Sequence, residues 1–104
     1  MKNRKYIDNL KLMSKGISLH SIGIDETAWT AEKLYIVLNE IKKCNVTILG
    51  GDVYKIENGK IHSTTDSWFF TNENIESRVN LSMEYVEKYE NNNIGTFIYS
   101  IILC

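Results

Sequence analysis

The 104-residue chain has no proline, only two cysteines, and only two arginines among its twelve basic residues. Without proline, slow cis–trans proline isomerisation cannot limit folding. The two cysteines, Cys44 and Cys104, are too few for the disulfide framework of a small secreted protein, so we expect both to be thiols. The longest strongly apolar run, residues 98–104, is interrupted by Ser100 and is far shorter than the roughly 20 residues that span a bilayer.

The chain also lacks a broad charge of either sign, because thirteen acids nearly balance the twelve bases. A nucleic-acid-binding protein usually clusters its bases, since phosphate neutralisation supplies most of its affinity. We therefore expect neither a nucleic-acid partner nor a membrane partner. Residues 1–5 are basic, but Asp8, Asn9 and Lys11 interrupt the apolar segment that a signal peptide would need. Length and composition favour one cytoplasmic globular domain over residues 1–104.

The spacing of apolar residues predicts three helices. They cover residues 4–15, residues 30–44, and a segment that begins between residues 72 and 77 and ends near residue 90. Thr30 is the expected N-cap of the second helix. Between the first two helices, one further turn is expected from Ser18, as its cap, to Gly23, as its stop.

A β-hairpin is predicted from residue 46 to about residue 71. Asn58 and Gly59 form its turn, because both residues tolerate the positive φ of a type I′ turn. Counting outward from this turn, and assuming no bulge, places Asp52 opposite Thr65. The glycine pair at residues 50–51 predicts a bulge in the first strand, or a point where another segment comes close.

A final strand over residues 95–103 completes the order ααββαβ. This order predicts an α+β fold with helices packed on one face of a small, mainly antiparallel three-stranded sheet. The last strand is expected beside the first, which makes all neighbouring strands antiparallel.

Alternation along the hairpin divides its residues between two sheet faces. The face expected to form the core carries Val46, Ile48, Tyr54, Ile56, Ile61 and Phe69. The opposite face carries Lys55, His62, Thr64, Asp66 and Trp68. Because this second face is polar yet holds a tryptophan, we expect it to be a wet binding surface.

Three separated motifs carry a resemblance to a known family. They are residues 48–55 (ILGGDVYK), residues 15–24 (KGISLHSIGI) with Trp29 ahead of the helix at Thr30, and residues 66–69 (DSWF). In order and spacing the chain resembles the immunity protein 40 family of bacterial polymorphic toxin systems, from about Tyr6 to the last strand. The resemblance implies that the protein binds and neutralises a cognate toxin, and it brings no catalytic residues with it.

An inhibitor of this kind needs shape and charge complementarity to its partner. The candidate toxin-facing residues are Asp52, Asp66 and Trp68. Each also has an ordinary structural interpretation, because aspartates in turns and bulges bond nearby backbone amides and tryptophans fill cores. The sequence leaves the toxin's activity and the oligomeric state open.

Two other functions are weaker alternatives. The two predicted helices that flank residues 16–24 suggest a DNA-binding module of the helix-turn-helix type. Asp25 and Glu26 argue against it, because they would lie where the DNA phosphates approach. A small cytoplasmic enzyme would need a catalytic group, and Asp52, His62 and Asp66 are accompanied by no nucleophile or phosphate-binding loop. No metal-ligand spacing is present, so we expect no cofactor and no metal.

Overall fold

The computed structural model describes residues 16–44 and 46–104. In chain order the elements are β1 (Ile17–Ser18), the 3-10 helix η1 (His20–Ile22), β2 (Thr27–Ala28), α2 (Ala31–Lys43), β3 (Ile48–Glu57), β4 (Lys60–Phe69), the 3-10 helix η2 (Ile75–Ser77), α3 (Arg78–Asn92) and β5 (Thr96–Leu103). The helix predicted over residues 4–15 lies outside the described residues.

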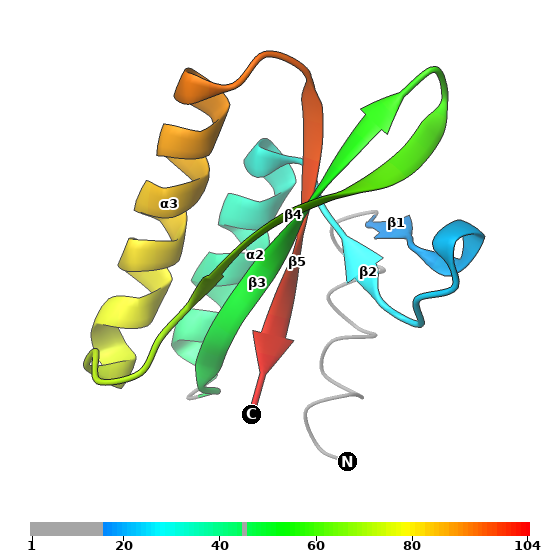
Figure 1. The fold of residues 1–104 in the computed structure, drawn as a ribbon. Coiled ribbons are helices and arrows are strands. Elements are labelled where there is room, and N and C mark those ends of the chain that lie inside the picture. Colours follow the sequence, from blue (N-terminus) through cyan, green and yellow to red (C-terminus); the bar gives the residue numbers. More distant parts are fainter. Residues whose placement is uncertain (1–15, 45) are drawn as a thin grey trace.

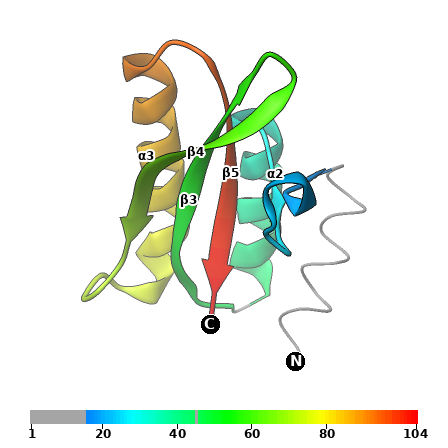
Figure 2. The ribbon, with the colours of Figure 1, turned by 45° about the vertical axis from the view of Figure 1, so that its right-hand side comes forward.

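The main sheet has three antiparallel strands in the order β4-β3-β5, so the last strand lies beside the first strand of the hairpin as predicted. Helices α2 and α3 pack side by side against one face of this sheet (Figure 1). The view in Figure 2 shows the same two layers, with both helices behind the strands. The α+β class is confirmed, and so is the packing of these two helices on one face of the sheet. The predicted order ααββαβ is not matched, because β1 and β2 precede α2.

The expectation of a single sheet is wrong. Strands β1 and β2 form a second, two-stranded antiparallel sheet, in which Ile17 pairs with Ala28. A strand of two residues is too short to show the alternation from which strands are recognised in a sequence. The residue after β2, Trp29, pairs with Tyr99 of β5 and so joins the small sheet to the main one.

Both faces of the main sheet are covered, each by its own apolar cluster. The helix side holds a large cluster that includes Leu34, Val37, Leu38, Ile41, Val53, Trp68, Val86, Tyr99 and Ile101. On the opposite side, a smaller cluster of Leu19, Ala28, Tyr54 and Ile98 packs beneath β1, η1 and β2. Near the hairpin turn, neither face of the sheet is therefore fully exposed to solvent.

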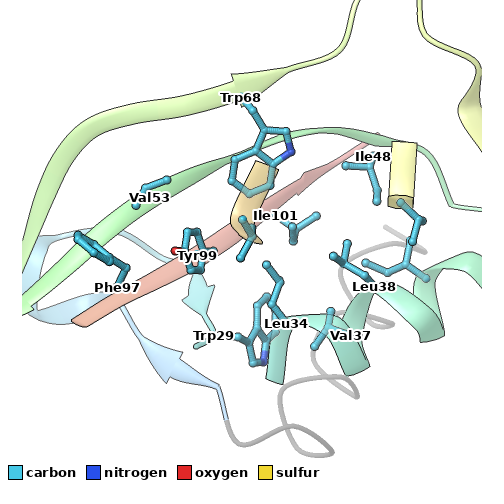
Figure 3. Packing of buried hydrophobic residues seen from close by; sticks show 13 residues of the cluster. Trp29, Leu34, Val37, Leu38, Ile48, Val53, Trp68, Phe97, Tyr99 and Ile101 are labelled. Carbon is cyan, nitrogen blue, oxygen red and sulfur yellow. The ribbon is translucent and has the colours of Figure 1, made fainter. Parts of the chain in front are cut away.

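Trp68 belongs to the helix-side cluster, with only 7% of its surface exposed. Figure 3 shows its indole directed toward Tyr99 and Ile101. The expectation that Trp68 lies on a wet sheet face is therefore wrong. Strand alternation does place Trp68 on the face opposite Tyr54, as predicted, but α2 and α3 cover that face.

The hairpin turn and the register next to it are confirmed. Asn58 and Gly59 have φ values of 53° and 73°, and Tyr54 pairs with Ser63. Farther from the turn the register shifts, so that Asp52 pairs with Ser67 rather than with Thr65. The bulge responsible lies in β4, where Thr65 has a φ of 66°, a conformation that costs energy for a residue with a branched Cβ.

The glycine pair interrupts the sheet as predicted. Gly50 has a φ of 155°, and the pairing of β3 with β5 shifts between Ile48 and Gly50. A Cβ on Gly50 would overlap the carbonyl oxygen of Trp68. These residues therefore provide both a bulge and a close approach of two strands.

The predicted helix ends are largely confirmed. Thr30 is the N-cap residue of α2, and Gly23 ends η1 in the left-handed conformation. The N-cap position of η1 is Leu19 and not the predicted Ser18, although the Ser18 hydroxyl accepts a hydrogen bond from the His20 amide. Arg78, the first residue of α3, is buried and donates to the carbonyl of Ile48 at 2.9 Å, which ties the start of α3 to β3.

Candidate functional site

Asp52 lies in the middle of the central strand β3 and is partly exposed. Its register partners are Ser67 on β4 and Ser100 on β5. Because alternate residues of a strand share a face, its side chain lies on the same sheet face as Tyr54, opposite the helices.

A second acid, Glu26, directly precedes β2, and the charge of Asp52 acts on it. Partial burial, and then the charges of Asp52 and Asp25, raise the pKa of Glu26 above its usual range. Burial also raises the pKa of Tyr54, and the charges of Asp52 and Glu26 add to that rise. The site is therefore a place where negative charge is concentrated and partly desolvated.

Ser100 lies beneath these groups, opposite Asp52 in the sheet. The residue is fully buried, and its hydroxyl lies beside the Tyr54 hydroxyl, in a geometry that falls short of a full hydrogen bond. It lies near enough to the Tyr54 oxygen to offset part of the rise in the Tyr54 pKa. A buried polar group without a full hydrogen bond is uncommon in folded proteins, because it costs free energy.

Phe69, the last residue of β4, completes this surface. It pairs with Gly50 and therefore shares the face of Ser67 and Asp52, and 65% of its surface is exposed. We define the Asp52 face by five residues from four segments of the chain: Glu26, Asp52, Tyr54, Phe69 and Ser100.

Asp66 lies elsewhere, at the bulge on the edge strand β4. Its carboxylate accepts a hydrogen bond of 2.7 Å from the Tyr89 hydroxyl of α3, and its amide donates to the Thr64 hydroxyl. Burial, and then this bond to Asp66, raise the pKa of Tyr89 above its usual range. Asp66 is thus exposed to solvent on the helix side of the sheet, and these two hydrogen bonds hold it in place.

Trp68 is the centre of an aromatic cluster between β4, α3 and β5. Its ring centroid lies 4.8 Å from that of Tyr85, and its indole N–H donates to the buried Ser82 hydroxyl at 3.1 Å. The ring centroids of Tyr99 and Trp68 are 6.5 Å apart. The Tyr99 hydroxyl donates a hydrogen bond of 2.6 Å to the Glu90 carboxylate. Burial and this bond to the Glu90 carboxylate raise the pKa of Tyr99 far above its usual range.

The structure therefore does not bring the three sequence candidates together. Asp52 is on one face of the sheet, Asp66 is at its edge, and Trp68 is in the core on the other face. Sequence reasoning missed Glu26 and Ser100 as neighbours of Asp52. Glu26 was recognisable only as an acid in a connector, and Ser100 only as an interruption in an apolar strand.

The alternatives gain no geometric support from the described residues. Across residues 16–44 and 46–104, no group of three or more His, Cys, Asp or Glu is arranged to hold a metal ion. The nearest acid–histidine pair, His20 and Asp25 at 3.0 Å, is exposed to solvent. Residues 17–28 form a small sheet, which is not the turn of a helix-turn-helix motif. No helix in the same ranges is long and apolar enough to cross a membrane.

Comparison with known protein families gives one match: the model of the family described as immunity protein 40 matches residues 18–103. This range covers all the strands of both sheets except Ile17, together with both α-helices that the structure describes. No curated protein and no solved structure matches the chain.

Proposed function

Because the chain belongs to the immunity protein 40 family, we propose that it binds a cognate toxin of a polymorphic toxin system in the cytoplasm and so protects the bacterium that produces it. The family match over residues 18–103 is the observation that carries this proposal. The protein acts by occupying its partner, without chemistry of its own.

The charge of residues 16–104 favours a basic partner. Residues 16–104 contain twelve acids and seven bases, so this part of the chain carries a net negative charge although the whole chain is nearly neutral. Complementary charge increases the rate of association and selects against wrong partners. A toxin that acts on nucleic acid would present such a basic surface, because it must bind phosphates.

We propose the Asp52 face as the toxin-contacting surface. Phe69 provides a large exposed aromatic side chain beside a partly buried acid, and hot spots of protein interfaces typically combine such an anchor with a polar neighbour. Asp66, at the adjoining sheet edge, supplies a second contact of the same charge. Trp68 contributes indirectly, because it holds β4 against α3 and so fixes the position of both Asp66 and Phe69.

A growth assay tests the proposed function. The toxin to be tested is a toxin domain encoded by a gene that adjoins the gene of this chain, expressed in a bacterium from an inducible promoter. Co-expression of this chain should restore growth, and co-expression of an unrelated immunity protein should not. Unrestored growth with both proteins present in soluble form, or an adjoining metabolic operon with no toxin gene, would contradict the proposal.

A further inference from the structure

Strand β4 is an open edge of the main sheet. In the order β4-β3-β5, the only described partner of β4 is β3, whereas the other edge strand, β5, also pairs with Trp29 through Tyr99. β4 has ten residues, which is longer than the about five or six of an average strand. An edge strand presents a row of unpaired backbone N–H and C=O groups, to which another strand can bind.

The pairing of β4 with β3 determines which of these groups point outward. Glu57 and Lys60 close the hairpin turn, so the backbone groups of Lys60 point toward β3. Because this direction alternates along a strand, the N–H and C=O groups of Ile61 and Ser63 point away from the sheet. Within residues 16–44 and 46–104, no other segment bonds to these outward groups.

The bulge at Thr65 blunts the middle of the same edge. The Thr65 amide donates to the Ser63 hydroxyl at 3.3 Å, and the Tyr85 hydroxyl donates to the Ser67 carbonyl at 3.3 Å. Bulges and covering side chains of this kind hinder the pairing of an edge strand with another chain. Residues 60–63 lie between this bulge and the turn, and we call them the open segment.

The side chains of the open segment specify the kind of strand that can bind. Ile61 is partly buried and packs, like Ile22, against the small apolar cluster on the sheet face that carries Asp52. Lys60 is exposed on the opposite face, and no described acid forms an ion pair with it. A strand with an apolar residue beside Ile61 and an acid beside Lys60 would complement both faces.

A different protein fits the open segment better than a second copy of this chain. The segment contains no acid, so pairing of two copies through it would place no acid beside Lys60. The outward residues also share a sheet face with Phe69, the exposed aromatic residue at the end of β4. A strand added here would therefore continue the surface that we propose to contact the toxin.

We propose that the toxin adds one extended segment to the main sheet, beside residues 60–63 of β4, with an apolar residue next to Ile61 and an acid next to Lys60. This inference rests on the proposed function, because it takes the toxin as the source of the segment. In this mode of recognition, backbone hydrogen bonds supply affinity and alternate side chains supply specificity. One acid in the segment is compatible with a toxin whose remaining surface is basic.

Amide hydrogen exchange of the free protein and of the complex tests the pairing residue by residue. The outward amides of Ile61 and Ser63 should exchange freely in the free protein, and binding of the toxin domain should slow their exchange at least about tenfold. The amide of His62 points toward β3 and is the internal control, because it should be protected in both states. Unchanged exchange of Ile61 and Ser63 in a complex that forms would overturn the inference and leave the proposed function intact.

Two substitutions of Ser63 separate backbone pairing from side-chain contact. Ser63→Pro removes the hydroxyl and the outward N–H, whereas Ser63→Ala removes only the hydroxyl. Proline is tolerated on an edge strand where the N–H faces solvent. Ser63→Pro should weaken toxin binding at least about tenfold, Ser63→Ala should change it by less than about twofold, and equal affinities would overturn the inference. If thermal melting shows that the proline variant is unfolded, the exchange measurement decides the question.

A peptide probe tests the edge separately if wild type does not bind the toxin domain, a result that would contradict the proposed function. The blocked peptide Glu-Ile-Glu-Ile-Glu should shift the amide resonances of Ile61 and Ser63. The same peptide N-methylated at both isoleucines should not, because it lacks the donors that would face β4. Equal shifts with the two peptides, or no shifts at Ile61 and Ser63, would overturn the open segment as a strand-binding site.

Discussion

The indole of Trp68 lies directly over Gly51, its register partner across β3 and β4. A Cβ on Gly51 would overlap the six-membered ring of Trp68 and the carbonyl oxygen of Ser100. The glycine is needed because an aromatic ring and a neighbouring strand both occupy the space that a side chain would fill. The two motifs that stand far apart in the sequence, ILGGDVYK and DSWF, are thus two halves of one packing contact.

Gly51→Val should therefore destabilise the fold much more than Asp52→Asn. Inserting a branched side chain into a filled core costs about 3 kcal/mol or more, at the upper end of overpacking effects. Urea unfolding of both variants measures the difference. If Gly51→Val were as stable as wild type, the position of Trp68 over this glycine would be wrong.

Truncation of Trp68 tests the same contact from its other side. Trp68→Ala should lower the free energy of unfolding by roughly 3 to 5 kcal/mol, because it leaves a cavity and removes the partner of the buried Ser82 hydroxyl. Trp68→Phe retains most of the ring volume and should cost less. A free Trp68→Ala protein with an unchanged melting temperature would instead favour the original hypothesis that this side chain is exposed for binding.

The sequence predicts the parts of this fold that local chemistry determines. The Asn58-Gly59 turn sets the register as far as Tyr54 and Ser63, because its φ requirements are specific to these two residue types. The register is lost at Thr65, where a residue with no turn propensity adopts a positive φ in response to its tertiary surroundings. The candidate site was only partly predictable for a similar reason, since Ser100 meets Asp52 only through the pairing of β3 with β5, strands far apart in the sequence.

Gly59→Val should destabilise the hairpin through the backbone alone. Gly59 has a φ of 73°, and a Cβ placed there meets no atom within 4 Å. The left-handed conformation costs a residue with a side chain roughly 1–2 kcal/mol. Gly59→Asn is the matched control, because asparagine tolerates this conformation and should retain most of the stability in a thermal melt. Equal melting temperatures of the two variants would show that the turn relaxes to another type.

Tyr99 should make the stability of the protein depend on alkaline pH. Burial and the Glu90 carboxylate hold its folded-state pKa well above the value of about 10 found in unfolded chains. The stability that neutral Tyr99 contributes is fully present below about pH 10. It is lost as the pH rises above that value, because the tyrosine then ionises in the unfolded state but not in the folded state. Tyr99→Phe should reduce the slope of unfolding free energy against pH by up to about 1.4 kcal/mol per pH unit between roughly pH 10 and 12.

Phe97→Leu is the control for this measurement. Phe97 belongs to the same core cluster but does not titrate, so its truncation should lower stability at every pH and leave the slope unchanged. Identical slopes for wild type and Tyr99→Phe would mean that Tyr99 ionises equally readily in both states.

The most direct test of the central claim is a calorimetric titration of the toxin domain with wild type, Phe69→Ala and Ile94→Ala. Both substituted side chains are exposed, but only Phe69 lies on the Asp52 face, whereas Ile94 lies in the connection between α3 and β5. Wild type should bind tightly, Ile94→Ala should bind equally well, and Phe69→Ala should lose at least about 2 kcal/mol of binding free energy while it melts like wild type. Absence of binding by wild type would contradict the immunity function, and equal binding by all three proteins would contradict the Asp52 face as the surface that contacts the toxin.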